Sequence, residues 1–167
     1  MCQRGFGKDI QIDSQHELRG GTFNTAYLIT LRDQSKVILR VAPPQTADLA
    51  WEDDFLMRSE HAMQPFFAPI AALTPKTLLI DFTHQLIDRD YMFQTFIEGE
   101  RWDDIWEKLT PAENNLLWSQ FGDIIRQIHE VRGDTFGLPR PGFQFERWSD
   151  TVIDRLERTL QAAEGLQ

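Results

Sequence analysis

Hydrophobic residues in the first half of the chain occur in short runs that polar turns separate. Three of these runs predict β-strands, over residues 9–18, 26–32 and 36–42; the second and third are rich in β-branched and aromatic residues. The polar residues 33–35 connect the second and third runs as a hairpin. Pro43 and Pro44 end the third strand, because proline cannot donate a ladder hydrogen bond. The pattern predicts an antiparallel three-stranded meander.

The apolar spacing then becomes helical before two more strands follow. Residues 48–63 predict a helix, which Pro65 and Pro69 should shorten or kink. Residues 76–82 and 91–97 predict two further strands, separated by a polar turn. The side chains that carry the helical spacing are Trp51, Phe55, Leu56 and either Ser59 or Met63.

The second half of the chain predicts long amphipathic helices. Thr110, Pro111 and Glu113 form a helix-start signal, in which Thr and Glu cap each other and Pro suits the first helical position. The helix that follows should end near Gly133, and a last helix should span 146–163 after a Gly- and Pro-containing loop. The apolar stripe of the first helix is Leu116, Leu117, Phe121, Ile124, Ile125 and Ile128.

Composition and charge narrow the class of protein. The 167 residues include 17 Lys plus Arg and 26 Asp plus Glu, a net charge of −9. This balance argues against nucleic-acid binding, which needs clustered cations. No apolar run approaches the roughly 20 residues of a membrane-spanning helix, and residues 1–8 lack a signal-peptide core. The single cysteine, Cys2, excludes an internal disulfide, so a cytoplasmic location is expected.

Two features of the first half suggest chemistry. The turn Gly20-Gly21-Thr22-Phe23-Asn24-Thr25 offers backbone N–H groups and polar side chains that suit a phosphate, although a plain hairpin turn is the alternative. Arg40 interrupts an apolar strand, so it either faces solvent at an edge or needs a counter-charge. Glu60, on the helix that follows, is the candidate partner and is otherwise a solvated carboxylate.

The stretch 91–100 runs from an apolar strand into a glycine and acidic residues. Backbone groups at such a crossover can hydrogen-bond a flat heterocycle in a cleft between two lobes. The alternative is a core strand that ends in a turn.

The order of these features resembles the protein-kinase-like fold, and most closely the aminoglycoside phosphotransferase family with its choline- and homoserine-kinase-like relatives. The resemblance covers nearly the whole chain, although no single motif in it is decisive. The segments that carry it are 18–27 (glycine loop), 37–44 (third strand and proline exit), 57–60 (αC helix), 74–76 (entry to strand four), 97–100 (hinge exit), and 116–129 with 136–137 (first helix and loop of the C-lobe).

The resemblance implies an α+β fold with a kinase-like N-lobe. Residues 1–98 would form this nucleotide-binding lobe, a five-stranded antiparallel sheet with the αC helix. Residues 99–167 would form the hinge and the first helices of a truncated C-lobe.

The resemblance also implies an ATP site. Gly20, Gly21, Thr22, Asn24 and Thr25 would cover the phosphates. Arg40 takes the position of the family's lysine, a departure that changes phosphate geometry, and would pair with Glu60. On the base side, the implied residues are Ile38 against the adenine face, Gln94 at its edge, and the backbone of Thr95 and Phe96.

The catalytic residues of the family are expected to be missing from this chain. Its His-x-Asp-x-x-x-x-Asn loop and later Asp, which position the hydroxyl and bind Mg²⁺, have no counterpart here. Two partial matches, His129 to Asp134 and Asp81-Phe82-Thr83, lack the required Asn and Gly. We expect Asp134 at the surface, Asp81 at a strand end, and the other histidines, His16, His61 and His84, at the surface or in the core rather than on a metal.

Three hypotheses therefore stand. The first is the N-terminal part of an ATP-dependent kinase of small-molecule hydroxyls, inactive alone, whose acidic charge suits a cationic acceptor such as an aminoglycoside. The second is a non-catalytic protein that forms homodimers or binds a partner through exposed stripes on the helices at 116–128 and 148–160. The third is an α+β domain in which the glycine turn and Arg40 are coincidental.

Overall fold

The computed structural model describes residues 1–21, 23–44 and 56–164. Its centre is a five-stranded antiparallel sheet in the order β1-β2-β3-β5-β4. The first three strands form the predicted meander, and Gln34, with a φ of 68°, makes the tight connection between β2 and β3. The strands are β1 (Ile12–Leu18), β2 (Thr25–Leu31), β3 (Lys36–Val41), β4 (Thr77–Asp81) and β5 (Tyr91–Thr95).

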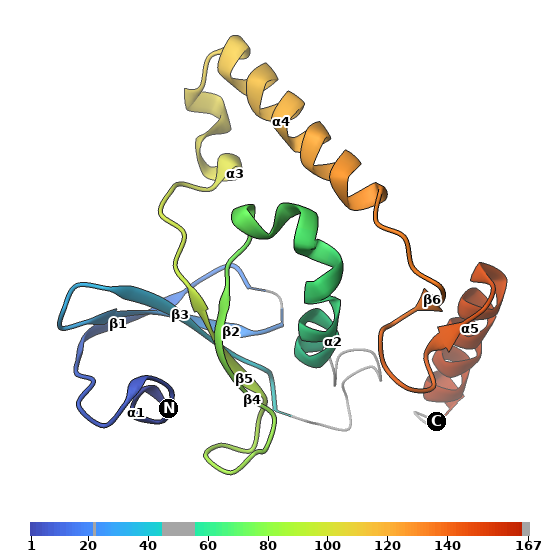
Figure 1. The fold of residues 1–167 in the computed structure, drawn as a ribbon, viewed down its shortest axis with the longest axis horizontal. Helices are drawn as coiled ribbons and strands as arrows, with labels where there is room; N and C mark the ends of the chain where they lie inside the picture. Colours follow the sequence, from blue (N-terminus) through green and yellow to red (C-terminus); the bar gives the residue numbers. More distant parts are fainter. Residues whose placement is uncertain (22, 45–55, 165–167) are drawn as a thin grey trace.

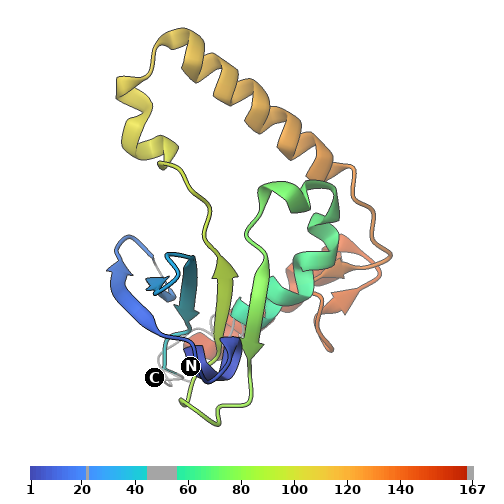
Figure 2. The ribbon, with the colours of Figure 1, turned by 60° about the vertical axis from the view of Figure 1, so that its left-hand side comes forward.

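Helices flank the sheet and continue after it. Figure 1 shows α1 and α2 on different sides of the sheet. Figure 2 shows α4 as a long helix that stands away from the sheet, joined to it by the chain that leaves β5. The helices are α1 (Cys2–Phe6), α2 (Leu56–Met63), the 3-10 helix η2 (Gln64–Leu73), α3 (Trp102–Ile105), the 3-10 helix η3 (Trp106–Lys108), α4 (Pro111–His129) and α5 (Trp148–Glu164), with a short hairpin of β6 (Phe136–Gly137) and β7 (Gln144–Phe145).

A five-stranded antiparallel sheet with a helix beside it and helices after it confirms the α+β class and the expected kinase-like N-lobe arrangement. The two prolines act as predicted: the α-helical geometry of α2 ends at Met63, Pro65 is the second residue of the 3-10 segment η2, and the backbone of η2 leaves helical geometry at Ile70, next to Pro69. The predicted helix positions 48–55 lie outside the described residues.

The start of α4 is confirmed in detail, but its predicted end was wrong. Thr110 Oγ1 accepts from the Glu113 amide at 3.3 Å, and the Glu113 carboxylate accepts from the Thr110 amide at 2.8 Å. The helix ends at His129 rather than near Gly133, because the Val131 amide turns to the Ile128 carbonyl at 3.1 Å and tightens the chain. A glycine was therefore not needed to stop it.

The hydrophobic core lies on one face of the sheet and is closed by α1. Alternation along β3 directs Val37, Leu39 and Val41 to this face, where each is 7% exposed or less. The ring of Phe6 from α1 packs edge-on against Phe93, with ring centroids 5.1 Å apart. The same alternation directs Ile38 and Arg40 to the opposite face. The remaining buried members of this core are Cys2, Ile29, Leu31 and Tyr91.

The amphipathic helices expose their apolar side chains. In α4, Leu116 and Trp118 are 59% and 60% exposed, and in α5, Leu156 and Leu160 are 60% and 63% exposed. The stripes predicted from the sequence are therefore present, and much of their apolar surface is exposed, although Leu117, Ile124, Ile125 and Ile128 of α4 are half-buried. None of the helices in the described part of the chain is both long and apolar enough to span a bilayer.

Asp81 at the end of β4 ties three elements together. It is at a strand end as expected, but it is only 6% exposed. Its carboxylate accepts from the Thr83 amide at 2.8 Å and from the Tyr91 hydroxyl at 2.9 Å, and Arg4 of α1 lies 3.2 Å away. The hydrogen bonds from Thr83 are the main cause that lowers the pKa of Asp81 to about 2. Burial, together with the hydrogen bond to Asp81, raises the pKa of Tyr91 to about 12.

This pKa predicts an acid-sensitive contribution to stability. Because the folded pKa of Asp81 lies below its usual 3.8, the ionised side chain stabilises the fold above that pH and loses its effect as the pH falls toward 2. We expect the difference in unfolding midpoint between wild type and Asp81→Asn to shrink across this range in urea titrations. The exposed Asp134→Asn variant is the control; an Asp81→Asn deficit that is unchanged at pH 2 would contradict the assignment.

Candidate functional site

Arg40 and Glu60 form the centre of the candidate site. Arg40 Nη1 donates to Glu60 Oε1 at 2.5 Å and Nη2 donates to Oε2 at 2.7 Å, so the two planar groups meet as a fork. Arg40 Nη1 also donates to Gln94 Oε1 at 3.3 Å. The prediction that Arg40 pairs with Glu60 is confirmed, and the alternative of an unpaired arginine in solvent is wrong. The Arg40 side chain is 24% exposed and that of Glu60 40%, so the pair is open on one side.

The register of the sheet places three predicted site residues on one face. Ile38 pairs across strands with Gln94, and Arg40 pairs with Met92. Side chains of directly opposed residues share a face, so Ile38, Arg40 and Gln94 lie together, away from the core closed by α1. Gln94 is only 6% exposed, which fixes its amide beside the arginine.

The glycine turn leads straight into the strand beside Arg40. In β2, Thr25 pairs with Val41 and Ala26 pairs with Arg40, so the turn before them ends next to the arginine. Gly20 has a φ of +97°, a conformation that other residues adopt with strain. A Cβ on Gly21 would stand 2.8 Å from the backbone oxygen of Asn24. Both glycines are therefore required by the backbone, while Thr22 lies outside the described residues.

The predicted hinge is only partly available for recognition of a base. The Thr95 amide donates to the Lys76 carbonyl at 2.9 Å, and the Thr95 hydroxyl accepts from the Lys76 amide at 2.9 Å. The Thr95 N–H is thus committed to the sheet. After β5 ends, Lys36 lies 5.0 Å from the centroid of the Phe96 ring and 2.8 Å from Glu98, which anchors the start of the hinge to β3.

A cavity of about 380 Å³ opens beside the ion pair. It lies between η2 and the strands β4 and β5, and both Glu60 and Gln94 line it. Apolar side chains, among them Phe67 and Ile70, form much of its wall. The polar groups that hold Arg40 therefore border open space instead of packed core.

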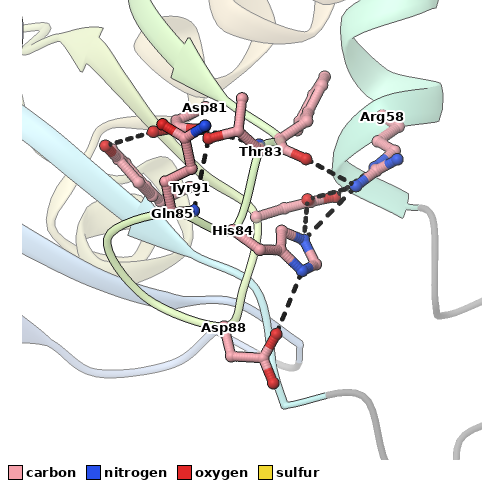
Figure 3. Close-up of polar contacts among 9 residues, drawn as sticks. Arg58, Asp81, Thr83, His84, Gln85, Asp88 and Tyr91 are labelled. Carbon is pink, nitrogen blue, oxygen red and sulfur yellow. Dashed lines mark hydrogen bonds and ion pairs between the residues drawn. The ribbon is translucent and has the colours of Figure 1, made fainter.

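A second polar cluster, missed by the sequence analysis, lies at the other end of β5 (Figure 3). Arg58 of α2 donates from Nε to Asp90 Oδ2 at 2.7 Å and from Nη2 to Oδ1 at 2.8 Å. His84 Nε2 lies 2.8 Å from the same Oδ1, and its Nδ1 lies 3.3 Å from Asp88. Burial acts to raise the pKa of Asp90, but the bonds from Arg58 and His84 outweigh it and lower that pKa.

His84 is therefore neither a plain surface nor a plain core residue, but part of this network. Its two ring nitrogens point to different carboxylates, which does not suit chelation. Among the described residues, no group of three or more His, Cys, Asp or Glu side chains is arranged to hold a metal ion. The expected surface position of Asp134 is confirmed.

Arg101 is a further cation that the sequence analysis did not single out. A Cβ on Gly20 would lie 3.4 Å from Arg101 Nη1, so this guanidinium stands against the glycine turn. Arg101 also pairs with Asp103 and lies 3.9 Å from Asp104. The only signal in the sequence for this placement was that Arg101 directly follows the predicted hinge.

Comparison with known proteins agrees with the resemblance drawn from the motifs. A family model described as "APH: Phosphotransferase enzyme family" matches residues 14–166, which is nearly the whole chain. No curated protein matches the chain.

The geometry of the turn gives a direct test. Gly21→Ala should lower the free energy of unfolding by more than ~1 kcal/mol, because the new Cβ meets the Asn24 backbone oxygen. Gly122→Ala, in the middle of α4 with nothing within 4 Å, is the matched control and should raise it by ~0.5–1 kcal/mol. Urea denaturation measures both; equal effects of the two substitutions would show that the turn is not constrained as described.

Proposed function

The chain belongs to the phosphotransferase enzyme family, and on that premise we propose that its sheet and α2 form the nucleotide-binding side of an ATP-dependent kinase acting on small-molecule hydroxyls. The observation that carries the proposal is the Arg40–Glu60 fork next to the glycine turn. A cation held by a carboxylate beside the end of a glycine-containing turn suits the binding of a polyphosphate.

On the phosphate side, Arg40 supplies the fixed positive charge. Glu60 and Gln94 orient its guanidinium, and its partial exposure leaves it accessible to an anion. Because arginine is a planar fork, it can contact two phosphate oxygens at once, where a lysine offers a point charge. The remaining proposed phosphate contacts are Gly20, Gly21, Thr22, Asn24 and Thr25. Because Thr25 is paired with Val41 of the core face, its proposed contribution comes from its backbone and not from its side chain.

On the base side, Ile38 offers an apolar surface for one face of the adenine. Gln94, its cross-strand partner, borders the edge of that surface. Since the Thr95 N–H is bonded to Lys76, donation to the base falls to the Phe96 backbone, with the Thr95 carbonyl as an acceptor.

The bound nucleotide would supply the γ-phosphoryl group, and the residues of this chain would hold and orient it. The 167 residues contain no His-x-Asp-x-x-x-x-Asn segment, so we propose that they bind ATP without transferring its phosphate and carry no Mg²⁺ ligands. The acceptor would be an alcohol group, and the net charge of −9 suits a cationic one. A cytoplasmic location fits an ATP-using protein whose single cysteine excludes an internal disulfide.

The family match favours this proposal over the alternative of a non-catalytic protein that dimerises through α4 and α5. That alternative depends only on the exposed apolar side chains of the two helices.

Binding is tested by thermal-shift titration with ATP. The midpoint of the wild-type chain should rise with ATP concentration, because a ligand that binds the folded state stabilises it. Arg40→Ala should need at least ~10-fold more ATP for the same rise, since a charge-assisted hydrogen bond is worth ~1.5–3 kcal/mol. Arg132→Ala, which removes an exposed arginine outside the site, is the control. Flat wild-type curves, or equal curves for Arg40→Ala, would refute binding at this site.

Turnover is tested by ADP release in the presence of ATP, Mg²⁺ and an aminoglycoside. We expect none above background from the 167 residues, because the carboxylate that positions the hydroxyl is missing. ADP release that Arg40→Ala abolishes would instead place a catalytic carboxylate among these residues.

A further inference from the structure

The fork between Arg40 and Glu60 depends on how α2 is oriented. Glu60 is a partly exposed residue on a helix of 8 residues, and one partly exposed ion pair fixes a helix weakly. Met57 is buried, at 2% exposed, and provides one apolar anchor. Met57 alone does not set the rotation of α2 about its axis, which also depends on the other contacts of the helix.

Arg58 supplies a contact on the opposite side of the helix. Residues two apart in a helix point about 200° apart, so Arg58 faces the chain between β4 and β5 while Glu60 faces β3. The carboxylate that receives Arg58, on Asp90, is 6% exposed, and the Asp90 backbone carbonyl accepts from the Ala42 amide at 2.9 Å. Arg58 is therefore bonded to a carboxylate that cannot shift without moving the sheet.

The two contacts of α2 reach the same rigid strand. Asp90 immediately precedes β5, and Gln94, in β5, accepts from Arg40. Between them, Met92 and Phe93 are each 0% exposed, so the spacing of the two ends is fixed. Arg58 thus holds α2 at one end of β5, and the Glu60–Arg40–Gln94 chain holds it near the other.

His84 keeps the Asp90 carboxylate in place. Its Nε2 approaches the same oxygen, Oδ1, that accepts from Arg58 Nη2, while Asp88 holds its other nitrogen (Figure 3). The carboxylate is therefore held from two directions.

We propose that Arg58 and Asp90 are positioning residues of the nucleotide site: their two-pronged ion pair, in which the Asp90 carboxylate is buried and the Arg58 side chain is 36% exposed, sets the orientation of α2 that brings Glu60 to Arg40. The orientation is a property of the free protein, and only its consequence for ATP rests on the proposed function. Without the pair, Arg40 loses its fixed geometry although no residue that would touch the nucleotide has changed.

The first experiment reads the Arg40 guanidinium directly by ¹H–¹⁵N NMR of the 167-residue chain without nucleotide. The Arg40 side-chain signal is the one that disappears in Arg40→Lys, and Glu60→Gln gives its position when the fork is broken. Arg58→Gln should move the signal toward the Glu60→Gln position. A signal that stays at its wild-type position in Arg58→Gln would overturn the proposal.

The matched control is Asp81→Asn. It removes a carboxylate that is equally buried, at 6% exposed, and lies at the other side of the same loop, where it bonds Thr83 and Tyr91 rather than α2. Asp81→Asn should destabilise the chain but leave the Arg40 signal unchanged. A shift of the Arg40 signal as large as that in Arg58→Gln would show that any destabilisation of the fold moves it, and would overturn the proposal. If Arg58→Gln does not fold, the Arg40 signal is measured in Arg58→Lys instead, a variant that keeps the positive charge and loses the two-pronged hydrogen bonding.

The second experiment measures ATP affinity in two backgrounds. Arg58→Gln should weaken binding ~10-fold in the wild-type background and less than ~2-fold when Glu60→Gln is already present, because residues that act through one another are not additive. Equal losses in both backgrounds would overturn action through Glu60. If the wild-type chain does not bind ATP at all, the proposed function fails, while the NMR result still decides the positioning.

Discussion

An arginine on the face of a sheet strand needs a counter-charge, and this need organises the structure around Arg40. Removing a guanidinium from water without a partner is costly, so β3 and α2 must meet where Glu60 can reach it. The pairing brings together β3 and α2, which are not adjacent in the sequence. The cavity beside the pair and the partly exposed guanidinium follow from this meeting, since both partners keep one side open.

The two faces of strand β3 carry different kinds of side chain, one set in the core and the other in the candidate site. Its odd-numbered residues Val37, Leu39 and Val41 are buried under α1, and its even-numbered residues Ile38 and Arg40 lie on the opposite face, where Arg40 contacts Glu60 of α2. The Arg40 face carries its polar groups beside buried apolar residues, among them Met92 and Met57, which are 0% and 2% exposed. The carboxylate of Asp81 and that of Asp90 close the ends of β4 and β5 and join α1 and α2 to this frame.

Structural features that depend on neighbouring residues could be predicted from the sequence, and most contacts between residues far apart in the sequence could not. Strands, hairpins and the Thr110–Glu113 cap are local, and each was confirmed. The helix α1 was missed because five residues show no period, although its Phe6 helps to seal the core. The Arg58–Asp90 pair was missed because nothing in the sequence around either residue indicates that the other is its partner. Arg40 and Glu60 were found only because a strand cation demands a partner and the family resemblance indicated which one.

The proposed function of this member of the phosphotransferase family depends on one interaction: Arg40, held by Glu60, would be the cation that receives the phosphates of a nucleotide. A crystal structure of the chain with a non-hydrolysable ATP analogue tests it most directly. We expect phosphate oxygens within hydrogen-bond distance of the Arg40 guanidinium while Glu60 remains paired with it. An analogue bound elsewhere, with Arg40 in contact only with protein, would contradict it.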